Sequence, residues 1–367
     1  MRLLAGLLLL LSIPLLAQDH RLDTLAEGLH HPWGLAELPD GGLLVGERRG
    51  RLLRLTPEGG RHEVSGLPDI AAAGQGGLLD LALHPDFADN RWLYFSYSQP
   101  GRGGAGTAVA RARLEGDRLQ SLEVLFEQQP KTSGGGHFGS RLVFDRDGYL
   151  FITTGERFHA RNQAQQLDSH LGKIIRLHDD GRVPADNPFV GQADALPEIW
   201  SYGHRNLQGA AIHPATGELW THEHGPRGGD EVNLIKKGAN YGWPLATFGE
   251  EYGGGRIGPS SRPGMEDPLW VWVPSIAPSG MMFYTGGLFP QWRNQLFVGA
   301  LVGQRLVRLE LDGDRVVQEH HLLRGLARLR TVAQAADGGI YLLTDEPNGK
   351  LLKLMPAQYA DFSLELR

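Results

Sequence analysis

The sequence predicts an all-β protein, a six-bladed β-propeller of four-stranded antiparallel blades. A strand–turn–strand pattern recurs six times along the chain, tight turns join its paired apolar runs, and several copies continue into a third strand. Glycine supplies 51 of the 367 residues, about twice its usual share of roughly 7%, which is typical of short strands joined by many turns.

Each copy has a small or polar entry, an alternating apolar run, a turn and a second apolar run. The copies begin at Pro32, Gly77, Gly139, Leu207, Phe289 and Arg330. Their turns contain pairs such as Asp147-Gly148, which tolerate positive φ between paired strands. A third strand follows at Lys173 (KIIRL) and at Lys350 (KLLKL), so blades around an axis fit the pattern better than a sandwich.

Uneven spacing between the copies indicates long loops, and loops at one end of a rigid propeller are where a site is usually built. The segment ARNQAQQLDSHLGK around Gln163 is the best candidate for a short helix. No linker divides the chain, so we expect one domain over residues 18–367.

The first 17 residues have the order of a secretory signal peptide. Arg2 precedes an apolar run from Leu3 to Leu16, with cleavage expected after Ala17. The run is shorter than the roughly 20 residues of a membrane-spanning helix, so we expect no membrane insertion and a periplasmic or secreted protein. The chain has no cysteine, so its core must hold it without disulfides, and a net charge of −6 gives no attraction for nucleic acid.

Two glycine-rich segments are candidates for chemistry. In GGGHFGS, three glycines precede His137, which we expect to be an exposed imidazole; a histidine that only fills a turn is the alternative. In EHGPRGGDEVN, a Gly-Pro step lies near Asp230 and Glu231, which suits calcium, although an acidic surface turn explains it as well. His222 and His224 are conceivable zinc ligands, but a third ligand at useful spacing is missing.

Two arginine segments are candidates for binding an anion. Arg205 and Asn206 follow a glycine in GHRNLQG, where a carboxylate ligand or a structural salt bridge explains the arginine equally well. Arg328 and Arg330 alternate, so both guanidinium groups face the same side of a strand. Two adjacent like charges are costly unless an anion lies between them, which favours an anion site.

Together these segments resemble the soluble glucose and aldose sugar dehydrogenases that depend on pyrroloquinoline quinone (PQQ). The resemblance covers nearly the whole mature chain and is closest to the aldose branch. Its most specific segments are GQGGLLDLALHPDF, GHRNLQG, EHGPRGGDEVN with GANYGWPLATFGEEY, and YLLTDEPNGKLLKL.

The resemblance implies roles for matching residues. His137 corresponds to the general base that removes the proton from the anomeric hydroxyl, with Gln75 beside the sugar and quinone and Glu156 near the histidine. The cofactor-binding residues it implies are Arg205, Asn206, Arg328, Arg330 and Tyr252. Tyr252 and Trp272 are also expected near the sugar.

The resemblance also implies two calcium ions. Gly225 and Pro226 would offer main-chain carbonyls to the Ca²⁺ that touches the quinone, and Glu231 and Tyr241 would hold a second, structural Ca²⁺. One position departs from the family, because Val302 stands where relatives have a cofactor-contacting lysine. Either Arg305, which is close in sequence, takes the place of that lysine, or one contact to the cofactor is missing.

The implied reaction oxidises an aldose at C1 to the lactone. Calcium polarises the C5 carbonyl of the quinone, His137 takes the hydroxyl proton, hydride passes to C5, and an external acceptor then reoxidises the cofactor. Two other classes remain open: a calcium-dependent propeller lactonase or esterase, and a non-catalytic binding propeller such as hedgehog-interacting protein, although such modules are usually disulfide-rich. The sequence does not distinguish a monomer from a homodimer.

Overall fold

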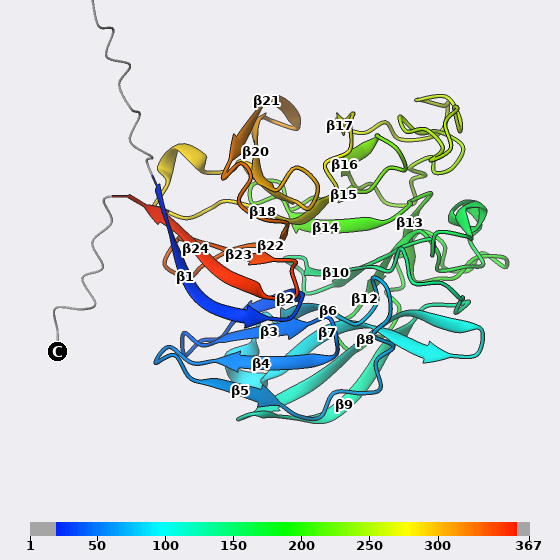
Figure 1. Cartoon of the computed structure of the whole chain (residues 1–367). Helices are drawn as coiled ribbons and strands as arrows, with labels where there is room; N and C mark the ends of the chain where they lie inside the picture. Colours follow the sequence, from blue (N-terminus) through cyan, green and yellow to red (C-terminus); the bar gives the residue numbers. More distant parts are fainter. Residues whose placement is uncertain (1–19, 358–367) are drawn as a thin grey trace, which may run out of the picture.

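The computed structural model describes residues 20–357 as six four-stranded antiparallel sheets around a central axis (Figure 1). The predicted fold class is therefore confirmed. The proposed signal peptide, residues 1–17 with its cut after Ala17, lies outside the described residues. Within residues 20–357 the chain contains no helix with the length and apolar character needed to span a membrane.

The first five blades use strands in chain order, and the first strand of each blade lies nearest the axis. The first two blades are β2 (Pro32–Glu37), β3 (Leu43–Glu47), β4 (Arg51–Leu55) and β5 (Arg61–Val64), then β6 (Leu78–Leu83), β7 (Trp92–Gly101), β8 (Gly104–Glu115) and β9 (Arg118–Glu127). The third and fourth are β10 (Gly139–Phe144), β11 (Leu150–Thr154), β12 (Lys173–Leu177) and β13 (Ile199–Tyr202), then β14 (Leu207–Ile212), β15 (Leu219–Glu223), β16 (Asp230–Leu234) and β17 (Trp270–Trp272). The fifth is β18 (Pro278–Phe283), β19 (Leu296–Ala300), β20 (Arg305–Asp312) and β21 (Arg315–Leu322).

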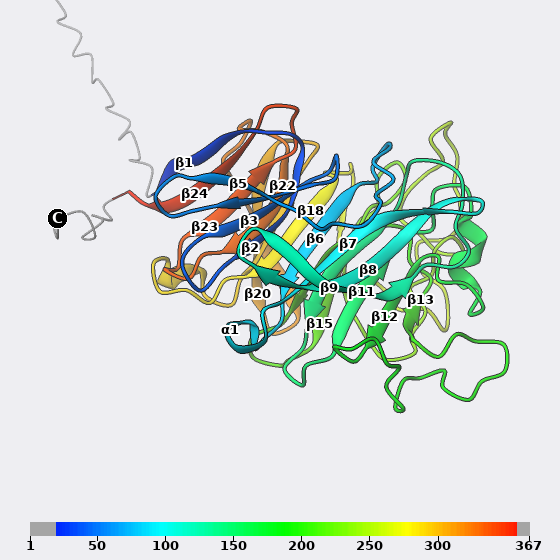
Figure 2. The same cartoon turned by 90° about the horizontal axis from the view of Figure 1, so that it is seen from below.

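The sixth blade closes the ring with strands from both ends of the described chain. Its strands are β22 (Leu329–Gln334), β23 (Ile340–Thr344), β24 (Gly349–Pro356) and β1 (His20–Leu29). β1 pairs with β24 from His20 opposite Pro356 to Leu29 opposite Gly349, and the two strands lie side by side in Figures 1 and 2. Because β1 leads directly into β2 of the first blade, its backbone hydrogen bonds to β24 hold the start of the described chain against the last blade, in a chain without cysteine.

The hydrophobic core lies between neighbouring blades. Between the first and second blades, for example, Leu44 and Leu52 pack with Leu81 and Phe95, all of them buried. Both faces of most strands are covered in this way, and burying each large apolar side chain contributes roughly 1.5–3 kcal/mol. The loops at the blade ends therefore rest on a rigid scaffold.

Two sequence expectations need correction in detail. The fifth repeat, read from Phe289, begins too late, because its inner strand β18 already starts at Pro278. Residues 284–295, which contain a short 3₁₀ helix, η2 (Pro290–Trp292), separate that strand from β19. No Asp-Gly turn marked that connection. The segment around Gln163 forms only one 3₁₀ helix, η1 (Arg161–Gln165). The other described helix is α1 (Phe87–Asn90).

A buried polar cluster closes the propeller axis. The Arg141 guanidinium bonds to Asp80 at 3.0 Å, donates to the carbonyls of Gln208 at 2.7 Å and Arg330 at 3.2 Å, and stacks over the Trp33 ring at 4.0 Å. These residues come from five blades, so one side chain ties the innermost strands together. It also forms a fixed floor beneath the loops at one end.

Candidate functional site

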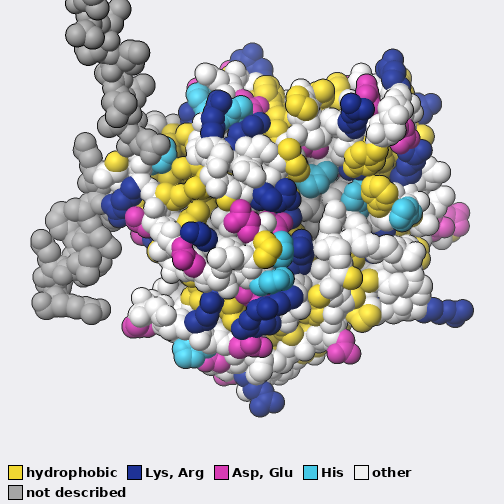
Figure 3. Space-filling view, viewed as in Figure 1, with side chains coloured by type: hydrophobic (Ala, Val, Ile, Leu, Met, Phe, Trp, Pro, Cys, Tyr) yellow, Lys and Arg dark blue, Asp and Glu magenta, His cyan; other side chains and the backbone are white. Residues whose placement is uncertain are grey.

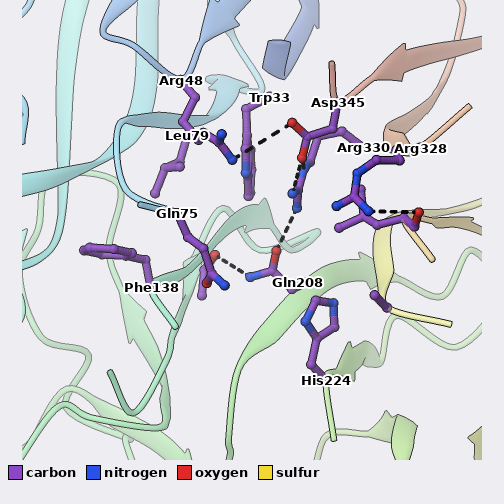
Figure 4. Close-up of a pocket in the computed structure, with 13 residues that line it drawn as sticks. Trp33, Arg48, Gln75, Leu79, Phe138, Gln208, His224, Arg328, Arg330 and Asp345 are labelled. Atoms are coloured by element: carbon purple, nitrogen blue, oxygen red, sulfur yellow. Dashed lines mark hydrogen bonds and ion pairs between the residues drawn. The ribbon is translucent and has the colours of Figure 1, made fainter. Parts of the chain in front are cut away.

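A cavity of about 260 Å³ lies at the end of the axis, above this floor. Figure 3 shows Lys, Arg and His side chains around a hollow near the centre of the face that Figure 1 presents. Figure 4 shows that the lining side chains converge from loops and inner strands of different blades. The lining residues are Trp33, Arg48, Gln75, Leu79, Phe138, Gly139, Gln208, His224, Ala277, Leu301, Arg328, Arg330 and Asp345.

The cavity carries three guanidinium groups and one carboxylate. Asp345 accepts from Arg330 Nη2 at 2.6 Å and from the His31 ring at 2.7 Å, while Arg48 approaches it only to 4.0 Å. Arg328 donates to the Leu301 carbonyl at 3.3 Å. Burial opposes ionisation of Asp345, but the charge and hydrogen bonds of Arg330 outweigh it and hold the pKa of this carboxyl well below its ordinary value. The cavity is thus cationic, as the Arg328–Arg330 alternation predicts.

His137 is held by two of the residues predicted to act with it. Its Nδ1 lies 2.8 Å from Glu156 Oε1, and its backbone N–H donates to Gln75 Oε1 at 2.8 Å. The Glu156 carboxylate accepts from Nδ1, which selects the tautomer with the proton on that nitrogen and leaves Nε2 as the nitrogen that can accept a proton. Burial lowers the pKa of His137 below its ordinary value, although the Glu156 hydrogen bond opposes this shift.

The expectation of an exposed imidazole is wrong, since His137 is only 5% exposed. The loop that follows β11 covers it, and the Phe158 ring lies against the imidazole with centroids 5.1 Å apart. Close approach of the two loops requires glycine: a Cβ on Gly155 would lie 2.2 Å from the His137 carbonyl oxygen. Arg157 holds the other side, donating to the carbonyls of Gly134 (2.6 Å) and Gly136.

Arg205 connects the His137 side of the site with the Gly225-Pro226 turn. Its Nη1 donates to the carbonyls of Gly225 at 2.7 Å and His224 at 3.0 Å, and its Nη2 donates to the Tyr252 hydroxyl at 3.0 Å. Glu156, Arg205, Pro226 and Tyr252 line a second cavity of about 300 Å³ beside the first. The imidazole loop and the turn therefore meet at the same end of the propeller.

Asn206 and Gln208 join the two cavities through hydrogen bonds. Asn206 Oδ1 accepts from the Gly139 N–H at 3.2 Å and from Gln208 Nε2 at 3.2 Å, while Gln208 Oε1 accepts from Arg330 Nη1 at 2.9 Å. Asn206 thus aligns the His137 loop with the arginine side of the cavity.

Glu231, which is half-buried, forms a carboxylate pair with the buried Glu223 near the Gly225-Pro226 turn. It faces Glu223 across β15 and β16, and both line a small void with Tyr241. Glu223 is committed to His204 Nδ1 at 2.9 Å and to the Arg205 N–H, whereas Glu231 accepts only a 3.5 Å bond from Asn233. Burial and the Glu223 charge raise the pKa of Glu231 well above its ordinary value. The Tyr241 hydroxyl donates to the Leu234 carbonyl, so the atom that Tyr241 could offer to a cation is its own main-chain oxygen.

The site suits a flat polyanion and hard cations. The central cavity places Trp33 and Phe138 beside three guanidinium groups, which match the carboxylates of a planar ligand. The carbonyls of His224 and Gly225 already bind a cationic group, the Arg205 guanidinium, so their donor chemistry suits calcium once that side chain turns away. Among residues 20–357 no three His, Asp or Glu side chains form a metal cluster.

Asp230 has a structural role rather than that of a free ligand. Its oxygens accept from the N–H groups of Gly225 at 2.8 Å, Ile276 at 2.8 Å and Ala277 at 2.9 Å, and from Ser275 Oγ at 3.0 Å. The carboxylate therefore fixes the Gly225-Pro226 turn against the loop that precedes β18.

Sequence reasoning missed Arg48 and Asp345, although the repeat contains a signal for both. Arg48, Glu156, His224 and Asp345 all follow the second strand of their blades, at the end of the propeller where the cavities lie. Aligning the copies at that strand would have identified them. Trp272 and Arg305 line a separate groove between the fourth and fifth blades, so neither takes the place expected for it beside the sugar or the cofactor.

The chain is similar to several known proteins over most of its length. The family model described as glucose / sorbosone dehydrogenase matches residues 29–353. The chain is 48% identical to aldose sugar dehydrogenase YliI of Escherichia coli over 345 residues, covering 91% of this chain and 92% of that protein. A crystal structure of a glucose dehydrogenase is 52% identical with TM-score 0.89, covering 91% of this chain and 99% of that one. The PQQ-bound aldose sugar dehydrogenase of Streptomyces coelicolor is 31% identical with TM-score 0.75, covering 91% and 98%.

Proposed function

The chain belongs to the glucose / sorbosone dehydrogenase family, and from this premise we propose that it oxidises aldose sugars at C1 to the lactone, using PQQ and Ca²⁺. The observation that carries the proposal is that a cationic axial cavity lies next to an oriented imidazole. Gln75 lines this cavity and also accepts from the His137 backbone N–H, while Glu156 orients the His137 ring. Family membership makes the protein a sugar dehydrogenase; the cofactor, the metal and the residue roles are the parts proposed.

When bound, PQQ supplies the two-electron acceptor that no protein side chain provides. Arg328 and Arg330 would bind its carboxylates, Asn206 and Gln75 would contact its polar edge, and Trp33 would cover a ring face. Val302 replaces the family lysine, and Arg48 supplies a further guanidinium on the cavity wall in its place.

His137 acts as the general base. Its Nε2 accepts the proton of the C1 hydroxyl, and the Glu156 carboxylate stabilises the imidazolium that forms. Because burial lowers the pKa of His137, the imidazole stays neutral and ready to act at more acidic pH than a free histidine. Tyr252 and Pro226 line the adjoining cavity, where a sugar would approach.

Gly225 and Pro226 would bind the catalytic Ca²⁺ through their carbonyls, with Arg205 turning from the Gly225 oxygen toward the cofactor. Glu231 and the Tyr241 carbonyl would bind a structural Ca²⁺, which offsets the repulsion between Glu231 and Glu223.

Calcium is expected to raise the melting temperature of the cofactor-free protein, through a stabilisation of roughly 2.7 kcal/mol when free Ca²⁺ is about 100 times Kd. Glu231→Gln removes one of the two facing charges. This variant should be more stable than the wild type in EDTA and should lose most of the calcium-dependent increase, as measured by scanning calorimetry.

Glu63→Gln is the matched control, because Glu63 is a surface residue whose carboxylate pairs with Arg51. It should keep the full calcium response. If Glu231→Gln and the wild type respond equally to Ca²⁺, the structural site is not at Glu231.

The direct test of the function is reconstitution. PQQ and Ca²⁺ are added to the metal-stripped protein, and several aldoses are then tested as substrates. Each aldose supplies the electrons, and an artificial dye serves as the external acceptor whose reduction is followed. We expect turnover only when quinone, calcium and sugar are all present. Bound quinone without turnover on any aldose would contradict the proposal and favour a binding propeller.

The lactonase or esterase alternative predicts ester hydrolysis without quinone. Ser201, His204 and Glu223 are hydrogen-bonded in the order of a hydrolase triad, at 2.9 Å for each bond. Ser201 and His204 are fully buried, however, so no ester can reach the hydroxyl. We propose a periplasmic or secreted location from the first 17 residues alone, and either a monomer or a homodimer is compatible with the site.

A further inference from the structure

A groove between the fourth and fifth blades has no role in the proposed reaction. It encloses about 470 Å³, more than the central cavity, and lies between β17 and the strands β20 and β21. We call it the Trp groove and define it by Trp270, Trp272, Val273, Val302, Arg305 and Glu319.

The indole rings of the Trp groove are fixed by one carboxylate. Glu319 Oε2 accepts from Trp270 Nε1 at 3.2 Å and from Trp272 Nε1 at 3.0 Å, and Oε1 bonds to the His321 ring. The polar edges of both indoles are therefore satisfied within the protein. Trp272 is buried in the core, so the apolar surface that the groove offers to a ligand is that of the half-buried Trp270 ring, already held in place.

The mouth of the groove is apolar apart from one cation. Val273 is 68% exposed and Val302 is 53% exposed, so a ligand there would bury surface that is now in water. Arg305 lies beside them, and its buried Nε has no hydrogen-bond partner within residues 20–357. The groove therefore combines an aromatic wall, an apolar lip and the guanidinium group of Arg305.

The Trp groove shares a wall with the cofactor cavity. Val302 and Ile276 line the groove while the residues next to them, Leu301 and Ala277, line the cavity. The two segments are joined by backbone bonds from the Leu301 N–H to the Ala277 carbonyl and from the Val302 N–H to the Ile276 carbonyl, both 3.0 Å. A ligand in the groove would be separated from the cofactor by one layer of backbone.

We propose that the Trp groove binds the external electron acceptor, a small planar oxidant of the quinone class. This inference rests on the proposed function, since each sugar oxidised leaves two electrons and two protons that must be removed. A quinone takes up both pairs and becomes a hydroquinone. Its ring stacks on Trp270, and one carbonyl oxygen accepts from Arg305.

A second sugar ring matches the groove less well. Sugars are bound through many hydrogen bonds, but Glu319 and both indole N–H groups are already paired with one another. A flat aromatic ligand with one or two acceptor oxygens uses the surface that remains.

The first test uses the protein without cofactor, so that it does not depend on turnover. Titration with 1,4-naphthoquinone-2-sulfonate should quench tryptophan fluorescence saturably, and equilibrium dialysis should give the same Kd. Trp270→Ala and Val273→Asp should each raise this Kd at least about tenfold. Val273 is exposed, so its substitution leaves folding intact even if the tryptophan variant is unstable.

Trp92→Phe is the matched control, since Trp92 lies on β7 in the second blade and stacks with Arg111. It should leave Kd unchanged. Equal Kd values in the wild type and Val273→Asp would overturn the proposal. Displacement of the naphthoquinone by maltose, but not by a second quinone, would assign the groove to sugar and overturn it too.

The second test separates the two half-reactions of the reconstituted enzyme. Val273→Asp should raise KM for the naphthoquinone at least about tenfold, while sugar alone reduces the bound cofactor at the wild-type rate in anaerobic stopped-flow experiments. If sugar never reduces the cofactor, the proposed function fails. If reduction is normal and KM for the quinone is unchanged, only the role of the groove fails.

Discussion

Replacing His137 with alanine is expected to lower kcat for aldose oxidation roughly 10²–10⁴-fold, the usual contribution of a positioned general base. Glu156 orients the imidazole through a 2.8 Å contact, and the ring does not line the arginine cavity. Binding of PQQ, measured by its absorbance on titration, should therefore change little. Retained turnover would refute the assignment of the base.

Two further variants separate this role from a structural one. Glu156→Gln keeps the shape of the contact but lets an amide N–H face Nδ1, which favours the wrong tautomer, so kcat should also fall. His62→Ala removes a surface histidine that pairs with Asp117 and should keep full activity. In the wild type, the acidic limb of the kcat/KM profile should lie below the ordinary pKa of histidine, about 6.5, because burial disfavours the charged ring.

Replacing Arg330 with methionine is expected to weaken both PQQ binding and folding. The guanidinium bonds to Asp345 at 2.6 and 3.2 Å, and removing it leaves a buried carboxylate without its main partner. Breaking such a pair costs about 3–5 kcal/mol of unfolding free energy. Losing a charge-assisted hydrogen bond to the cofactor makes the binding free energy less favourable by roughly 1.5–3 kcal/mol, which raises Kd about 10–150-fold.

The two effects can be separated with neighbouring residues. Adding Asp345→Asn to Arg330→Met removes the uncompensated charge, so stability should recover while Kd stays high. Arg328→Met should affect cofactor binding far more than stability. Arg328 donates one 3.3 Å bond to the Leu301 carbonyl, whereas the guanidinium paired with Asp345 is that of Arg330. This variant should weaken cofactor binding with little change in unfolding free energy. A normal Kd in all three variants would remove these arginines from the cofactor site.

Much of the architecture could be predicted from local pattern. Copies with Asp-Gly turns, such as Asp147-Gly148, identified the blades correctly, because that turn chemistry is encoded in adjacent residues. The fifth blade was misread because the connection between β18 and β19 carries no such signal. β1 could not be assigned to the last blade, since its pairing with β24 joins residues more than 300 positions apart.

The sequence by itself determined the fold class, the family and the residue types of the site: an imidazole, carboxylates and paired arginines in glycine-rich loops. Only the tertiary structure decided that Asp345 neutralises Arg330, that His137 is buried, and that Trp272 and Arg305 belong to a separate groove. The physical reason is that propensities and turn signals act between neighbours in the chain. Charge pairing, burial and the walls of a cavity depend instead on side chains that come together only when six blades close into a ring.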